Sequence, residues 1–146
     1  NHLRVTKGPF TLTTKLVDGQ FPDYDKVVPK DASRTLTGDR DSLRQGFQRA
    51  SILSNEKYRG VRLAITPDQL TIQANNPEQE EAEEVVAVEF NGTDLEIGFN
   101  VSYLLDVLGV MSADSVRLSV SDANSSALLE SSEADDALYV VMPMRL

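Results

Sequence analysis

The spacing of short apolar segments constrains the fold of this chain more than any other feature. From Arg34 onward, one extended segment precedes a helical pattern, four extended segments follow, and a second helical pattern leads into three more. Most connections between the extended segments are as short as hairpin loops, and hairpins join antiparallel strands. Two helices then pack against antiparallel sheets, so the sequence predicts an α+β domain.

Two stretches have the periodicity of amphipathic helices. Between residues 43 and 53, at about 100° per residue, Leu43 begins an apolar arc, and Asp39 or Asp41 is a suitable N-cap. Ile52 falls on the opposite, polar side, which fits either a lone exposed residue or half of a subunit contact. Asn100 is the predicted N-cap of the second helix. The apolar arcs of the two helices comprise Leu43, Phe47, Ala50 and Leu53, and Val101, Leu104, Leu105, Leu108 and Met111.

Seven extended segments follow the first helix. They are predicted at residues 60–65, 69–74, 84–90, 94–99, 115–120, 127–130 and 138–142. Asn91-Gly92 is the strongest hairpin signal among their connections. Segment 138–142 is nearly continuous in apolar residues, as expected of a strand buried on both faces, and pairing should stop at Pro143. This last strand either only closes the core or also offers its methionine-bearing tail to a partner.

The first 29 residues predict an incomplete unit. Alternating patterns at 3–7 and 10–17 flank Gly8-Pro9 and indicate a hairpin, with Phe10, Leu12 and Leu16 on buried faces. Residues 27–30 read as an extended connection. Two strands cannot bury a face alone, so we expect residues 1–29 to end one domain and residues 30–146 to form a complete one. The chain begins without methionine in a strand pattern, and we expect it to be part of a longer polypeptide.

The charge and composition exclude several kinds of protein. The formal net charge is −9, which argues against a protein that binds nucleic acid with its whole surface. Cysteine is absent, which excludes disulfides and thiol chemistry. A local basic strip stays possible. No apolar run approaches the roughly 18 residues of a membrane helix. The single histidine, His2, is terminal, and no phosphate-binding glycine loop occurs, so no cofactor is predicted.

Two charged groups leave alternatives open. Five glutamates lie within residues 78–84, and they fit a solvated loop, a surface for basic residues of another subunit, or a metal site. The metal reading would be a phosphodiesterase using Glu80, Glu81 and Glu84. A third reading is an acidic scaffold domain without a DNA role. Arg44 and Arg49 on the first helix fit either a phosphate-facing surface or an ordinary solvated helix face.

Five stretches together resemble one family. They are KLVDGQFPDY at 15–24, ILSNEKYRG at 52–60, ANNPEQEEAEE at 74–84, IGFNVSY at 97–103 and YVVMPMRL at 139–146. The chain is similar along its whole length to the bacterial β sliding clamp, the beta subunit of DNA polymerase III. The resemblance implies a clamp fold, with residues 1–29 closing the second domain and 30–146 forming the third. It implies a non-enzymatic, cytoplasmic, nucleoid-associated protein that forms a homodimeric ring around duplex DNA.

The resemblance also implies three surfaces. DNA-facing positions would be Lys26, Arg44, Arg49, Lys57 and Arg59. Ring closure would use Ile52, Leu53, Glu80, Glu83 and Glu84, so this chain alone is expected to stay monomeric. A pocket for Gln-Leu-x-Leu-Phe-like motifs of polymerases, the clamp-loader delta subunit and mismatch-repair proteins would comprise Pro22, Val27, Asn100, Tyr103, Ser126, Val140, Met142, Pro143, Met144 and Arg145.

Overall fold

The computed structural model describes residues 1–21, 23–30, 32–133 and 137–145. Pro22, predicted for the partner pocket, and Leu146 lie outside the described residues. The elements in chain order are β1 (His2–Lys7), β2 (Phe10–Lys15), α1 (Tyr24–Val27), β3 (Arg34–Asp39), α2 (Arg40–Ser51), β4 (Gly60–Thr66), β5 (Gln69–Asn75), β6 (Glu81–Ala87), β7 (Glu89–Asn91), β8 (Leu95–Asn100), α3 (Val101–Val110), β9 (Ser115–Val120), β10 (Ala127–Ser131) and β11 (Tyr139–Val141).

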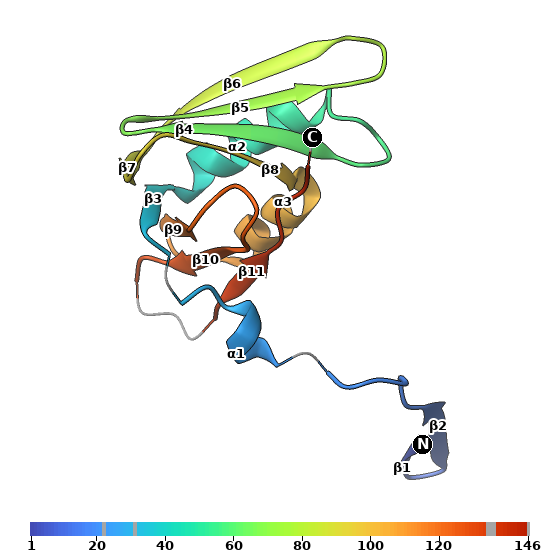
Figure 1. Cartoon of the computed structure of the whole chain (residues 1–146). Coiled ribbons are helices and arrows are strands. Elements are labelled where there is room, and N and C mark those ends of the chain that lie inside the picture. The colour runs from blue at the N-terminus through green and yellow to red at the C-terminus, as the bar shows by residue number, and fades with distance from the viewer. Residues whose placement is uncertain (22, 31, 134–136, 146) are drawn as a thin grey trace.

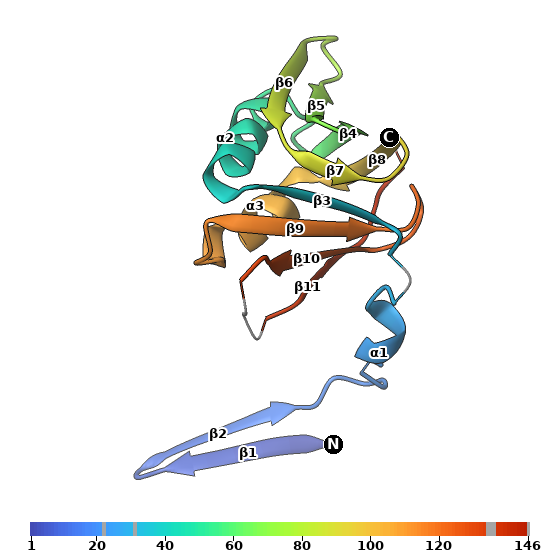
Figure 2. The ribbon, with the colours of Figure 1, turned by 90° about the vertical axis from the view of Figure 1, so that its left-hand side faces the viewer.

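Two antiparallel sheets and two helices form the main body (Figure 1). The five-stranded sheet has the order β11-β10-β9-β3-β7, and the four-stranded sheet has the order β6-β5-β4-β8. Helix α2 packs against α3, β6 and β5, while α3 contacts β8 and β11. Figure 2 shows the two helices side by side next to both sheets. The predicted α+β class is therefore confirmed.

The core lies where the helices meet the sheets. Phe99 of β8, Leu63 of β4 and Leu104 of α3 are almost completely buried, as is most of the predicted apolar face of each helix. Burying a side chain of this size stabilises the fold by roughly 1.5–3 kcal/mol relative to an exposed position. The predicted face of the first helix extends too far, because α2 ends at Ser51 and Leu53 follows it half-buried.

Both helix starts have the predicted type of N-cap. Asp39, rather than Asp41, caps α2, and its Oδ1 accepts a hydrogen bond from the backbone N–H of Ser42 at 2.7 Å. Hydrogen bonding from the Ser42 side chain, together with this backbone bond, lowers the pKa of the Asp39 carboxyl below its ordinary value. Asn100 caps α3, where its Oδ1 accepts from the backbone N–H of Ser102 at 2.9 Å.

The predicted strand at 84–90 is wrong, because two strands of different sheets occupy it. β6 pairs with β5 in the four-stranded sheet, and β7 pairs with β3 in the five-stranded sheet. The chain stays extended as it crosses between the sheets, so alternation alone does not reveal the crossing. The predicted hairpin at Asn91-Gly92 is also wrong, since β7 pairs with β3 and β8 with β4.

The last strand is not buried on both faces, contrary to the prediction. β11 is an edge strand paired only with β10, and the flanking Leu138 and Met142 are 53% and 63% exposed. Val141 alone among its residues is buried. Beyond Pro143 the tail crosses to the other sheet, where the backbone N–H of Met144 donates to the carbonyl of Gly98 on β8 at 2.8 Å. The carboxyl-terminal tail, which here means β11 and the residues after it up to Arg145, therefore contacts both sheets.

The N-terminal hairpin forms as predicted, but its side chains are not buried. β1 and β2 pair antiparallel, and Phe10, Leu12 and Leu16 are all more than half exposed. Figures 1 and 2 show the hairpin standing apart from the sheets. The extended connection predicted from residue 27 is wrong at its start, because Val27 ends the short helix α1, which Asp23 caps.

Candidate functional site

The carboxyl-terminal tail lies beside two groups of predicted pocket residues. On one side, the Ser126 hydroxyl donates to the carbonyl of Val27 at 3.1 Å, and this contact holds α1 against the start of β10. Val140 is opposite Leu128 of β10 in the sheet register. The structure therefore brings Val27, Ser126 and Val140 into one region through β10.

The second group lies around the start of α3. Asn100 caps the helix, and Tyr103 in its first turn is 58% exposed. Met144 reaches this region through its bond to Gly98, which lies on the same strand as Asn100. The tail thus runs from the α1 side of the domain to the start of α3.

Two open hollows flank the end of the tail, and both include Met144 and Arg145. Asn124 lines the first hollow, and Tyr58 lines the second. Neither of these two side chains was predicted for the site. No sequence motif identifies them, because they come from loops that approach the tail only in the folded chain.

The predicted ring-closing residues lie near the outer edge of the four-stranded sheet. Ile52 is 77% exposed directly after α2, as its place on the polar side predicts, and Leu53 is half-buried. β6 is the edge strand of this sheet, so its outer backbone groups lack a neighbouring strand in the part of the chain that the structure describes. Such an edge can pair with a strand from another molecule.

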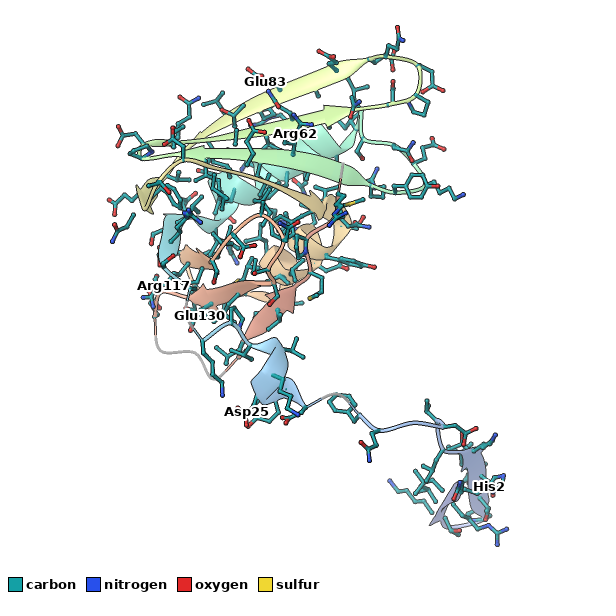
Figure 3. All side chains as sticks on the ribbon, in the orientation of Figure 1. His2, Asp25, Arg62, Glu83, Arg117 and Glu130 are labelled. Carbon is teal, nitrogen blue, oxygen red and sulfur yellow. The ribbon has the colours of Figure 1, made fainter. Side chains whose placement is uncertain are left out.

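The glutamates of this edge do not share one direction. The Glu80 carboxylate accepts from the Asn76 side-chain amide at 2.7 Å, and Glu83 accepts from Gln73 at 3.0 Å. Figure 3 shows Glu83 on the same face of the sheet as Arg62. Glu84 instead pairs with Arg49 of α2 at 2.8 Å, and this hydrogen bond lowers the pKa of Glu84 below its ordinary value. Successive residues of a strand alternate between its faces, which explains the divergence.

The five basic residues predicted to face DNA have different environments. Arg44 is exposed on α2, and Lys26 on α1 has its Nζ 3.8 Å from the carboxylate of Asp23. The ammonium of Lys57 lies 5.2 Å from the centre of the Tyr58 ring. Arg49 is paired with Glu84, and Arg59 is half-buried with its guanidinium bound to protein oxygens.

Comparisons with known proteins agree with this architecture. The family model described as "DNA polymerase III beta subunit, C-terminal domain" matches residues 25–145. The chain belongs to this family. Proteins named "Beta sliding clamp" match all 146 residues, with 63% identity in Pseudomonas putida and 53% in Escherichia coli K12.

Solved clamp structures show the same fold as this beta-subunit domain. A sliding clamp from Pseudomonas aeruginosa, crystallised with a ligand, has a TM-score of 0.88 and 62% identity over 99% of this chain and 40% of that one. A Bartonella birtlesii clamp has a TM-score of 0.87 and 40% identity over 98% of this chain and 38% of that one. The chain spans about 40% of the length of the curated relatives it matches.

The structure of this beta-subunit domain does not supply the metal site of the phosphodiesterase reading. Among the described residues, no three histidine, aspartate or glutamate side chains gather closely enough to hold a metal ion. Of the glutamates in that reading, Glu81 and Glu84 lie three positions apart on β6 and therefore on opposite faces of the strand, so they do not converge on one ion. No helix in the described part of the chain is long and apolar enough to span a membrane.

Proposed function

We propose that this chain is the C-terminal part of a sliding clamp, a non-catalytic processivity subunit of the replicative DNA polymerase. Residues 1–29 would close its second domain, and residues 30–146 would form its third. The observation that carries the proposal is the match of the entire chain to beta sliding clamps, with 63% identity to that of Pseudomonas putida. The full-length protein would be a cytoplasmic, nucleoid-associated homodimeric ring that encircles duplex DNA.

An inner basic strip supports sliding on DNA despite the net charge of −9. Arg44, Lys26 and Lys57 are exposed, and the contacts of Lys26 and Lys57 are with near neighbours in the sequence, Asp23 and Tyr58. Contacts of this kind attract phosphates without reading sequence, so the ring holds DNA by enclosing it rather than by tight binding. The resemblance also assigned Arg49 and Arg59 to this strip. Arg49 pairs with Glu84 of β6 and contributes less to the strip, and Arg59, whose guanidinium is bound to the carbonyl of Ser51, is not given a DNA contact.

Ring closure is proposed at the outer edge of β6. Ile52 supplies exposed apolar area, and Glu80 and Glu83 supply negative charge toward the solvent. A second subunit with a free strand edge and basic side chains would complement this surface. Glu84 is already paired with Arg49, so we assign it a smaller part in attracting the partner.

The tail is proposed to bind a short Leu- and Phe-containing motif of polymerases, the clamp-loader delta subunit and mismatch-repair proteins. Exposed Met142 and Tyr103 offer apolar surface. Polar groups come from Asn100, Ser126 and Arg145. The other described residues of the proposed pocket are Val27, Val140, Pro143 and Met144. Methionine side chains adapt to different ligands. A Pseudomonas aeruginosa clamp has been crystallised bound to griselimycin, which shows that a relative of this chain takes a ligand.

A topological assay tests the clamp proposal. The full-length protein is loaded with a clamp loader onto nicked circular DNA, and the retained fraction is measured before and after the DNA is cut to a linear form. A clamp stays on the circle and slides off the linear ends. Equal retention on both forms would refute encirclement.

A separate titration tests the peptide pocket. Adding a Gln-Leu-x-Leu-Phe peptide should shift the NMR signals of Tyr103, Val140 and Met142, while a peptide with alanine at the Leu and Phe positions serves as the control. Unchanged signals at millimolar peptide would remove the pocket from the proposal but leave the ring intact.

A further inference from the structure

Arg59 lies between the end of α2 and the start of α3. Its backbone N–H donates to the carbonyl of Asn55 at 2.7 Å, and its own carbonyl accepts from the backbone N–H of Val101 at 2.8 Å. Val101 is the first residue of α3, and its N–H has no partner within its own helix. The backbone of Arg59 therefore forms part of the cap of α3.

The Arg59 side chain reaches the end of the other helix. Nη1 donates to the carbonyl of Ser51, the last residue of α2, at 3.0 Å, and Nε lies 3.5 Å from the hydroxyl of Ser102. A positive charge at a helix C-terminus is favourable, because the unpaired carbonyls there carry partial negative charge. One guanidinium thus contacts both helices.

Arg59 makes these contacts in an unfavourable backbone conformation. Its φ is 51°, in the left-handed region that residues other than glycine, asparagine and aspartate rarely adopt. Such a conformation persists where surrounding contacts fix it, and it often occurs at functional positions. The hydrogen bonds on both sides of Arg59 are contacts of this kind.

Each residue that the guanidinium contacts directly precedes a proposed functional surface. Ser51 precedes Ile52 of the ring-closing surface, and Ser102 precedes Tyr103 of the peptide pocket. We infer that Arg59 is a positioning residue that fixes these two surfaces relative to each other, and that it is not a DNA contact. This inference rests on the proposed clamp function.

Arg40 makes a similar link at the other end of the two helices. It is the first residue of α2, and its Nη1 donates at 2.6 Å to the carbonyl of Met111, the C-cap residue directly after α3. The helices are therefore antiparallel and each end is joined by one arginine. Arg40 lies at the opposite end from Ile52 and Tyr103, so it serves as a control for a purely structural effect.

Lysine substitution separates positioning from charge. Arg59→Lys keeps the positive charge but loses the planar group that reaches two acceptors, so a DNA contact would tolerate it and a positioning residue would not. Arg59→Asn removes the charge and suits the left-handed conformation, which keeps the backbone intact. Both variants, with Arg40→Lys as the matched control, would be made in the full-length clamp.

Three measurements decide the inference. We expect both Arg59 variants to weaken motif-peptide binding and dimerisation by about threefold or more, and to shift the amide signals of Ser102 and Tyr103. Arg40→Lys should lower the urea midpoint while leaving both binding constants within about twofold. Retention of Arg59→Asn on circular DNA should keep the salt dependence of the parent, whereas loss of a DNA contact would make that dependence shallower.

Two results would overturn the positioning role. One is an Arg59→Lys clamp with parental peptide binding, dimerisation and Tyr103 signal. The other is an equal loss of binding in Arg40→Lys, which would indicate general destabilisation. If the parent clamp does not bind the peptide, the proposed pocket fails, and the dimer constant with the Ser102 and Tyr103 signals still decides the role of Arg59.

Discussion

Replacing Gly46 with alanine tests how closely α2 packs on the four-stranded sheet. Gly46 is buried in α2, and a Cβ there would lie 2.8 Å from Cγ2 of Val86 and 3.2 Å from Cδ1 of Ile72. Alanine gains about 1 kcal/mol over glycine in a helix interior. Overpacking costs typically about 1–3 kcal/mol. Because Val86 and Ile72 are themselves buried and cannot simply rotate away, the cost should exceed the gain.

We expect Gly46→Ala to lower the free energy of unfolding by about 1 kcal/mol, which corresponds to about 4 °C in Tm for a domain of this size. The change in the free energy of unfolding is measured from the shift of the urea midpoint at an unchanged m-value. Gly109→Ala is the matched control, because Gly109 also lies in a helix but a Cβ there would meet no atom within 4 Å. Gly109→Ala should stabilise the chain by about 1 kcal/mol or less, because Gly109 lies next to the last residue of α3 and the full gain applies to a helix interior. If Gly46→Ala were as stable as Gly109→Ala, the close approach of α2 to β6 would be refuted.

Three further predictions concern the cap, the core and the ring-closing surface. Hydrogen bonds from Ser42 lower the pKa of Asp39 in the folded chain below its ordinary value of 3.8. The stabilisation by the ionised Asp39 cap is therefore complete above pH 3.8 and is lost as the pH falls through the lower pKa of the folded chain. When unfolding is measured along an acid titration, Asp39→Asn should lose less stability than the parent, and an unchanged profile would contradict this. Leu104→Ala, at a site only 1% exposed, should cost about 2–5 kcal/mol in urea unfolding, and a loss below 1 kcal/mol would contradict its core position. Ile52→Ala should change unfolding by less than about 0.5 kcal/mol yet shift the full-length clamp toward monomer in sedimentation, whereas unchanged sedimentation would remove Ile52 from the interface.

The helices and their caps were predictable because their signals are local. Asn100 and Asp39 stand directly before an apolar pattern of helical period, and a cap bonds to a backbone N–H only two or three residues away. The core positions of α3 follow from the same period, since a helix exposes or buries residues by angle alone. The α+β class follows from these helices together with the short connections between strands.

The division into sheets was not predictable, because strand partners are not local. Nothing in the pattern of residues 84–90 indicates that pairing changes from β5 to β3 near Val88. The same limit applies to β11. An apolar run indicates that its side chains favour burial, but the strand order of the sheet decides whether the strand has a neighbouring strand on each side. β11 pairs only with β10.

The charged residues of the site show the same limit. The pattern left Arg49 open between a phosphate-facing and a solvated helix face, and the resemblance placed it on the DNA-facing surface and Glu84 on the ring-closing surface. Neither source indicates that the two side chains meet. The structure joins the two side chains at 2.8 Å across α2 and β6. Arg59 reaches both helix ends for a comparable reason, because the loop after α2 returns the chain to the start of α3.

The two proposed protein-binding surfaces lie closer together than the strand order suggests. β6 and β8 are opposite edges of the four-stranded sheet, roughly 14 Å apart at about 4.8 Å per strand. The end of the tail nevertheless shares a hollow with the loop between β5 and β6, because Arg145 and Asn76 both line it. The Asn76 side chain also binds Glu80 of the ring-closing surface. A substitution at Glu80 that weakened peptide binding would therefore act through this loop and would not establish that Glu80 touches the peptide.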